Sequence, residues 1–193
     1  VIMTANTHKN GTTRVAEAIK KVDCTHVILL QGDEPLLLPR HLNTLVNAIK
    51  LEPMGNSWNA TGPIENAEEL DRHSFVKCAI GQQNRIIFCF RRSPCYGEVE
   101  KQQIFIRKIL GIIAYKKEFL LNLTNLPPSK IEQVEFIEQM RILENGYELR
   151  SIPLCPSLPS VNEPNDAEIV LDYLQNDVEQ KQLLDKILTA EEH

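Results

Sequence analysis

Residues 26–35 read HVILLQGDEP, and the organisation of the chain is inferred outward from this stretch. Its first five residues are mostly apolar, which predicts a short strand buried on both faces. A glycine, two carboxylates (Asp33 and Glu34) and a proline follow, and the proline ends any strand pairing. Ligands of open α/β sheets bind just beyond the carboxyl ends of the strands. We therefore expect Asp33 at a site for a hard cation such as Mg²⁺ carrying a nucleotide phosphate; the alternative is a charged turn after a core strand.

The segments on either side of this stretch alternate between strand and helix patterns. Val1–Met3 is expected to be the tail of a strand, Thr12 or Thr13 to cap a first helix, and Pro39 to open a second. Both helices carry apolar stripes at helical spacing, namely Val15, Ala18, Ile19 and Val22, then Leu42, Leu45, Val46 and Ile49. This alternation is typical of a doubly wound α/β sheet with mostly parallel strands.

The middle of the chain carries strand patterns in closer succession. Strands are expected at 59–64, 75–80, 85–90 and 104–115, with Gly81–Asn84 joining the second and third as a hairpin. Helices are expected over Lys130–Asn145 and from Asp166 onward. No internal repeat and no second domain are evident, so the sequence predicts a single domain over residues 1–193.

Composition argues against two classes of partner. Charged residues make up 24% of the chain and the formal net charge is -5, with basic residues dispersed apart from Arg91-Arg92 and Lys116-Lys117. A nucleic-acid surface needs a clustered positive face, so no nucleic-acid partner is expected. No run approaches the length of a transmembrane helix, so no membrane partner is expected. The cysteines show no C-x-x-C spacing, which favours the reduced thiols of a cytoplasmic protein.

Several short motifs, in order along the chain, resemble one enzyme family. Met3-Thr4 is followed by H-x-x-G-T-x-R-V-A-E at 8–17, and QGDEP stands at 31–35. The later matches are Pro63–Glu69 with Val76-Lys77, then PSKIEQVEFIEQMR at 128–141 and VNEPND at 161–166. Together they resemble 3-deoxy-manno-octulosonate cytidylyltransferase, also called CMP-KDO synthetase, over nearly the whole chain.

This resemblance implies a fold, a reaction and a cofactor. The implied enzyme couples CTP to a 3-deoxy-2-ulosonic acid and releases pyrophosphate, for lipopolysaccharide or a related surface glycan. The implied fold is nucleotide-diphospho-sugar transferase-like, a doubly wound, mostly parallel sheet with a β-arm that pairs two subunits. Mg²⁺ is the implied cofactor, a homodimer the implied assembly and the cytoplasm the implied location. Catalysis of this kind depends mainly on positioning and charge neutralisation.

The resemblance also implies roles for individual residues. Asp33 is implied as a catalytic residue and Mg²⁺ ligand, Asn162 as a second metal ligand, and Arg14 as a catalytic residue near phosphate or sugar charge. For Arg14 a surface role is the alternative. The implied nucleotide contacts are Thr4, Asn10, Gly11, Thr12 and Gln31. The implied sugar contacts are Gln31, Arg91, Glu138 and Gln139, and for the last two a solvated helix face is the alternative.

The chain departs from the family near both ends of the motif series. The family's glycine- and arginine-rich phosphate loop has no match, so we expect the first strand and this loop to be missing before Val1. Asn162 stands where the family has an aspartate. An amide offers a carbonyl oxygen but no charge, so Mg²⁺ binding should weaken unless Glu163 or Asp166 compensates.

The sugar site shows a second kind of departure. Ile109 and Ile113 stand where the family has a histidine and a tyrosine. Each sugar hydroxyl left unpaired costs about 1–3 kcal/mol, and sites that read a hydroxyl discriminate strongly. Two alternatives therefore remain open: activation of a different acidic sugar with CTP, or a catalytically degenerate relative that acts as a binding module.

Overall fold

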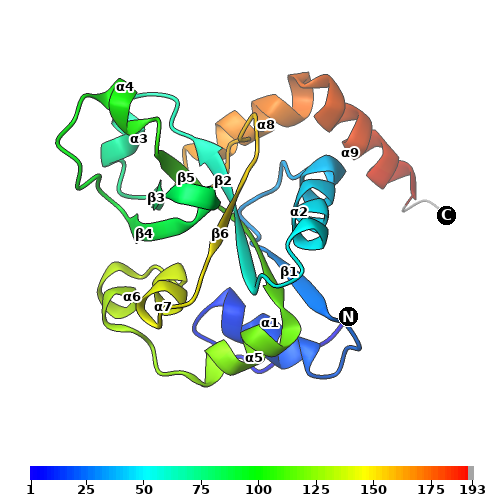
Figure 1. Ribbon diagram of the computed structural model, residues 1–193. Coiled ribbons are helices and arrows are strands. Elements are labelled where there is room, and N and C mark those ends of the chain that lie inside the picture. The colour runs from blue at the N-terminus through cyan, green and yellow to red at the C-terminus, as the bar shows by residue number, and fades with distance from the viewer. Residues whose placement is uncertain (191–193) are drawn as a thin grey trace.

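The computed structural model describes residues 1–190, and its strands form one sheet with helices on both faces (Figure 1). The strands are β1 (His26–Leu30), β2 (Ser57–Pro63), β3 (Lys77–Ile80), β4 (Ile86–Phe90), β5 (Ile106–Lys116) and β6 (Arg150–Pro153). The longer helices are α1 (Gly11–Ile19), α2 (Pro39–Leu51), α5 (Lys117–Asn125), α8 (Asp166–Asn176) and α9 (Val178–Ala190). The shorter ones are α3 (Glu68–Asp71), α4 (Val99–Gln102), α6 (Lys130–Glu135), α7 (Gln139–Glu144) and the 3-10 turn η1 (Gln82–Asn84).

Strand β5 is the centre of the sheet. It pairs antiparallel with β2 along one side, and on the other side with β3 near its start and β1 near its end. Strands β1, β2, β3 and β6 run one way and β4 and β5 the other, and β2 and β6 form the parallel pair. The α/β class and the prevailing strand direction are confirmed. The antiparallel insertion of β5 was not predicted, because an apolar run carries no information about strand direction.

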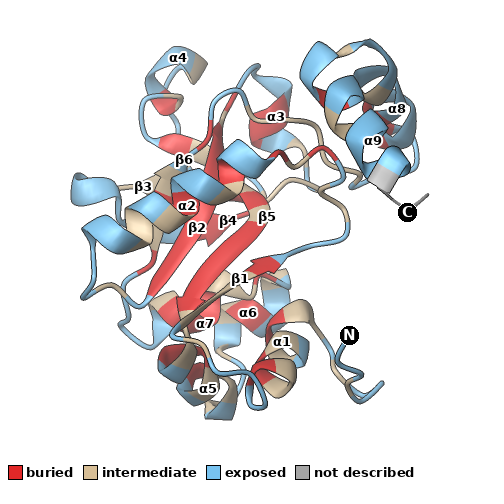
Figure 2. Cartoon of the chain, turned by 90° about the vertical axis from the view of Figure 1, so that its right-hand side faces the viewer, coloured by how far each residue is buried: buried red, intermediate tan, exposed pale blue. Residues whose placement is uncertain are grey.

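Alternate residues of β5 face two hydrophobic clusters, as a pleated strand requires. Ile113 and Tyr115 pack with residues of α1, α5 and α7 on one face. Leu110, Ile112 and Ala114 pack with residues of α2 and β2 on the other. Figure 2 shows β2 and β5 as the buried centre of the molecule. Helices therefore cover both faces, which confirms the doubly wound arrangement.

Two expectations about strands were wrong, and one was confirmed. Strand β1 is not buried on both faces: Leu29 is 4% exposed, but Leu30, the last residue of the strand, points to the opposite face and is 46% exposed. Val1–Met3 is exposed and forms no strand, since it has no strand partner. The hairpin is confirmed, because β3 and β4 pair antiparallel across η1.

The helix expected over Lys130–Asn145 is interrupted. Phe136 adopts a left-handed conformation with φ 55° and ψ 44°, which ends α6, and α7 starts three residues later. The guanidinium of Arg91 donates to the carbonyl of Glu135 at 2.8 Å and so takes up a group that a continuous helix would use itself. A tertiary contact from the residue after β4 thus accompanies a break that local propensity does not predict.

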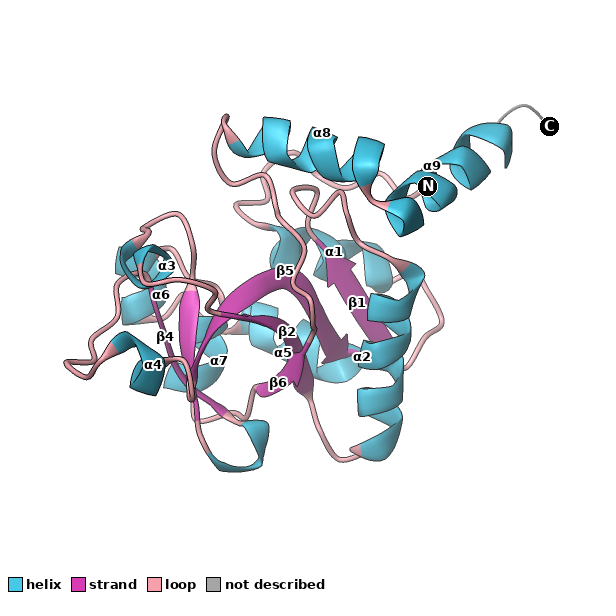
Figure 3. Ribbon diagram, turned by 90° about the horizontal axis from the view of Figure 1, so that it is seen from above, coloured by secondary structure: helices cyan, strands magenta, loops and turns pink. Residues whose placement is uncertain are grey.

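The C-terminal helices lie outside the sheet. Seen from above, α8 and α9 run along one edge of the molecule (Figure 3). The predicted helix from Asp166 onward is confirmed as α8. Among residues 1–190, no helix is long and apolar enough to cross a membrane.

Candidate functional site

A pocket of about 630 Å³ lies beyond the carboxyl end of β1. Its walls come from the turn after β1, from β5, from the segment before β3, from the α6–α7 junction and from the loop before α8. The predicted site residues that line it are Gln31, Asp33, Arg91, Glu138, Gln139 and Asn162. The predicted residues outside its lining are Thr4, Asn10, Gly11, Thr12 and Arg14.

The turn after β1 is held directly against β5. The Gln31 N–H donates to the Gly111 carbonyl at 2.9 Å, and the Gly111 N–H donates to Glu34 Oε1 at 2.6 Å. A Cβ at Gly111 would stand 2.9 Å from Glu34 Cγ and 3.0 Å from Gln31 Cβ. Position 111 therefore needs a glycine so that the turn can approach the strand this closely.

The same turn holds the loop that carries Asn162. The Ser160 hydroxyl donates to Glu34 Oε2 at 2.8 Å, and the Val161 N–H donates to the Asp33 carbonyl at 2.9 Å. Burial raises the pKa of Glu34, while its bonds to Gly111 and Ser160 oppose that rise. These contacts bring Asn162 next to Asp33, 129 positions away in the sequence numbering.

Asp33 has the chemistry of a cation ligand. Its Oδ1 is buried and has no hydrogen-bond partner within the described chain. A buried carboxylate oxygen without a partner is costly, and a bound cation would satisfy it. Residues 1–190 contain no cluster of three or more His, Cys, Asp or Glu side chains suited to a metal.

Asp166 is engaged by other groups of the protein. Its Oδ2 accepts the N–H groups of Asn162 and Glu163 at 3.0 and 2.9 Å, and its Oδ1 accepts Arg72 Nη2 at 2.8 Å. Burial works against ionisation, yet the bonds from Arg72 and from the two N–H groups lower the pKa of Asp166. Asp166 therefore holds the loop that carries Asn162, and each of its oxygens has a hydrogen-bond partner in the protein.

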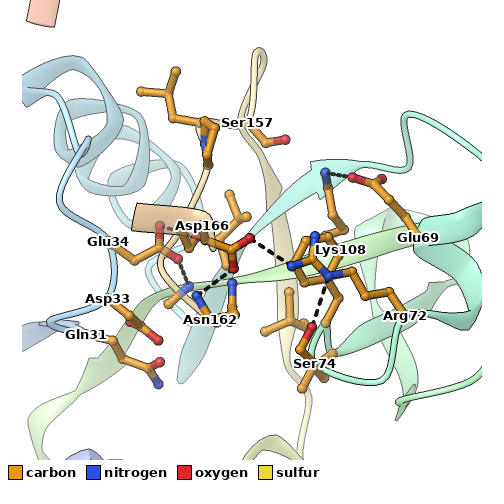
Figure 4. A pocket seen from close by; sticks show the side chains of 18 of the residues that line it. Gln31, Asp33, Glu34, Glu69, Arg72, Ser74, Lys108, Ser157, Asn162 and Asp166 are labelled. Carbon is orange, nitrogen blue, oxygen red and sulfur yellow. Dashed lines mark hydrogen bonds and ion pairs between the residues drawn. The ribbon is translucent and has the colours of Figure 1, made fainter. Parts of the chain in front are cut away.

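Opposite Asp33, the pocket wall carries cations that sequence reasoning missed. Figure 4 shows Asp33 and Glu34 on one side and Arg72, Lys108 and Glu69 on the other. Lys108 Nζ lies 2.7 Å from Glu69 Oε1, and both side chains are nearly buried. The Arg72 guanidinium stacks 4.2 Å from the centre of the Phe75 ring. Pairs 39 and 94 positions apart leave no local signal in a sequence.

Arg91, predicted as a sugar contact, is also engaged by the protein. Besides the Glu135 carbonyl, it donates from Nη1 to the His73 carbonyl at 2.9 Å. It joins the segment before β3 to the α6–α7 junction. Arg91, like Arg72 and Lys108, therefore already has partners within the protein, and an anion entering the pocket must compete for it.

Glu138 and Gln139 lie at the start of α7 and face the pocket, not a solvated helix surface. Glu138 Oε2 accepts the Thr12 hydroxyl, and burial raises the pKa of Glu138. Gln139 Nε2 donates to Asn59 Oδ1 at 3.0 Å, and Asn59 is itself fully buried and bonded to the Leu110 carbonyl. Both side chains are thus oriented by neighbours behind the wall.

The other predicted residues gather around the N-terminus of α1. Asn10, not Thr12 or Thr13, caps this helix: its Oδ1 accepts the Thr13 N–H at 3.0 Å. Arg14 Nη1 donates to the Thr4 hydroxyl at 2.9 Å. Thr12 links this cluster to the pocket through Glu138.

The two isoleucines noted in the sequence have different surroundings. Ile109 lines the pocket. Ile113 is 4% exposed and belongs to the hydrophobic cluster with α1, α5 and α7. Only Ile109 therefore forms part of the pocket surface.

Comparison with known proteins identifies the family. Residues 1–152 match the family described as cytidylyltransferase. The 3-deoxy-manno-octulosonate cytidylyltransferase of Chlorobium limicola is 33% identical over 179 residues, which span 91% of this chain and 72% of that protein. The Escherichia coli protein of the same name is 33% identical over 166 residues, which span 84% of this chain and 65% of that protein.

A solved structure agrees with these matches. It is that of CMP:2-keto-3-deoxy-manno-octonic acid synthetase complexed with CTP, and it superposes with a TM-score of 0.83 at 30% identity. The superposition covers 92% of this chain and 73% of that one. The resemblance seen in the sequence motifs is confirmed, and the chain belongs to the cytidylyltransferase family of nucleotidyltransferases.

Proposed function

We propose that this chain transfers the cytidylyl group of CTP to a 3-deoxy-2-ulosonic acid of the KDO type, for a lipopolysaccharide or a related surface glycan. The anomeric hydroxyl of the acid attacks the α-phosphorus, a new O–P bond forms, and the bond to the β-phosphate oxygen breaks. Pyrophosphate leaves, and the hydroxyl proton passes to solvent. The observation that carries this proposal is Asp33, which lines the pocket of a cytidylyltransferase and has a buried oxygen without a hydrogen-bond partner in the described chain.

The chain's own residues supply binding and orientation for this step. Asp33 and Asn162, which both line the pocket, offer oxygens that suit a hard cation, and Mg²⁺ held there would neutralise charge on the triphosphate. Glu138 and Gln139 would bind the hydroxyls of the acid, and Gln31, which also lines the pocket, would contact both nucleotide and acid. Arg91 would serve the sugar site by fixing the backbone before α7.

The N-terminal cluster is the proposed nucleotide side of the site. Thr4, Asn10, Gly11 and Arg14 lie together at the start of α1, one contact away from the pocket through Thr12. We place the acceptor acid against α7 and the nucleotide toward this cluster. A homodimer and a cytoplasmic location, where CTP is available, complete the proposal.

Pyrophosphate release tests the reaction directly. The protein would be supplied with CTP, Mg²⁺ and a panel of ulosonic acids, beside the variants Asp33→Ala and Asp23→Ala. Asp23 is an exposed carboxylate in the turn before β1 and serves as the matched control. We expect turnover that Asp33→Ala abolishes and Asp23→Ala leaves intact. Turnover that survives in Asp33→Ala would remove the basis of the proposal.

A second candidate is activation of a different acidic sugar. Ile109 supports it, because an apolar side chain on the pocket wall cannot pair with a sugar hydroxyl. A preference for an acid that lacks one hydroxyl, reversed by Ile109→His, would favour this candidate over KDO itself. A degenerate binding module is the remaining candidate, supported by Asn162 in place of a carboxylate; CTP binding without any turnover across the panel would identify it.

A further inference from the structure

Thr12 is a buried hydroxyl one layer behind the pocket wall. It lies in the first turn of α1, is 7% exposed and does not line the pocket. Its Oγ1 donates to Oε2 of Glu138, which does line the pocket. The Thr12 hydroxyl is thus occupied by a hydrogen bond to a residue 126 positions away in the sequence.

Glu138 depends on this contact for its orientation. It occupies the position before α7, where its side chain makes no capping bond to its own helix. The preceding Phe136 leaves the helical path, so α6 gives Glu138 no continuous helix to hold it. Thr12 binds the Glu138 carboxylate from behind, and the Glu138 side chain lines the pocket, where a ligand can contact it.

We propose that Thr12 is a positioning residue that orients Glu138 toward the acceptor acid. Its hydroxyl affects binding of the acid and not binding of CTP. This inference rests on the proposed function, because Glu138 is taken there as a contact for the hydroxyls of the acid. A hydroxyl donor fixes the plane of the carboxylate and favours its ionised form, which accepts hydrogen bonds most strongly.

The charges around Glu138 give the contact a measurable signature. Burial raises the pKa of Glu138, and hydrogen bonds from Thr12 oppose that rise. Glu132 on α6 and Arg141 on α7 also face it, and so does the buried phenol of Tyr115 on β5. Loss of the Thr12 hydroxyl should therefore move the ionisation of Glu138 to higher pH.

Steady-state kinetics on the full chain separate the effect on binding of the acid from the effect on binding of CTP. Thr12→Val keeps the side-chain shape and removes the hydroxyl, Thr12→Ser keeps the hydroxyl, and Thr44→Val makes the same exchange on the exposed face of α2. We expect Thr12→Val to raise the KM for the acid roughly tenfold with little change in the KM for CTP. Thr12→Ser should keep the KM for the acid close to the wild-type value, and Thr44→Val should match the wild type.

A second readout needs no turnover. Carboxyl-carbon NMR titration of Glu138 should give a higher pKa in Thr12→Val than in the wild type, with Thr12→Ser close to the wild type. This measurement stands even if no acid in the panel is a substrate, so failure of the proposed function and failure of this inference are distinguishable. A folded Thr12→Val protein with an unchanged Glu138 pKa, or with a raised KM for CTP alone, would overturn the inference.

Discussion

Replacing Asp166 with alanine should loosen the loop that carries Asn162. Asp166 accepts three hydrogen bonds, from Arg72 at 2.8 Å and from the N–H groups of Asn162 and Glu163 at 3.0 and 2.9 Å. Bonds to a charged group contribute about 1.5–3 kcal/mol each when they are buried. Here the Arg72 side chain is 33% exposed and both N–H donors belong to exposed residues, so water replaces much of the loss. We expect a total cost of about 2–3 kcal/mol in the free energy of unfolding.

Glu163→Ala is the matched control for this change. The Glu163 carboxylate lies 3.6 Å from the same guanidinium and is 48% exposed, so its loss should cost less than about 0.5 kcal/mol. Urea unfolding gives the global cost for both variants. Hydrogen exchange of the Asn162 and Glu163 amides reports the loop itself, and Asp166→Ala should remove their protection.

The contact from Arg72 to Asp166 also predicts a functional effect. A loosened loop no longer holds Asn162 beside Asp33, so the affinity for CTP with Mg²⁺ should fall in Asp166→Ala and stay unchanged in Glu163→Ala. Equal unfolding free energies and equal amide protection in the two variants would show that Asp166 does not hold this loop. The loop would then be held by its contacts with Asp33 and Glu34 alone.

Three further changes test the interior. The Arg141 guanidinium is 9% exposed and is bonded to both Glu132 oxygens, so Glu132→Ala leaves it buried without its partner. Urea unfolding should show a loss of about 3–5 kcal/mol in the free energy of unfolding. Replacing both residues with leucine should cost much less, and an equal cost would contradict this explanation. Gly111→Ala forces the turn away from β5, so the melting temperature and CTP affinity should both fall; an unchanged affinity would contradict the close approach. Burial lowers the pKa of Lys77 from 10.5 to about 8. Between these two pH values the unfolded chain binds more protons than the folded one, so folding stability should rise with pH. The wild type should therefore gain stability relative to Lys77→Met as the pH rises through this range. Unfolding free energies that change in parallel with pH in the two proteins would contradict the lowered pKa of Lys77.

Local patterns predicted the elements that depend on local chemistry. The apolar run before Gln31 and the glycine, carboxylate and proline after it identified β1 and its turn, and with them the position of Asp33 in the pocket. Pro39 likewise marked the start of α2. Each of these signals lies within a few residues of the feature that it predicts.

Features that depend on distant partners were not predictable in this way. The break at Phe136 is accompanied by a contact from Arg91 to the residue before it, 44 positions away. The contact of Arg72 with Asp166 joins residues 94 positions apart, and the antiparallel placement of β5 depends on its three neighbouring strands. Their causes are tertiary contacts, and composition and periodicity carry no trace of these.

Phe136 has a consequence for how this protein can change over generations. A left-handed conformation costs an L-residue about 1–2 kcal/mol that glycine would not incur. The Phe136 ring is 81% exposed, so burial does not offset this cost, yet the side chain lines the pocket. Local stability therefore favours glycine at position 136 and does not explain an aromatic ring. Stability favours glycine at this position, whereas a ligand in the pocket contacts whatever side chain stands there. When the substrate of such a protein changes, position 136 should therefore be substituted earlier than positions in the core.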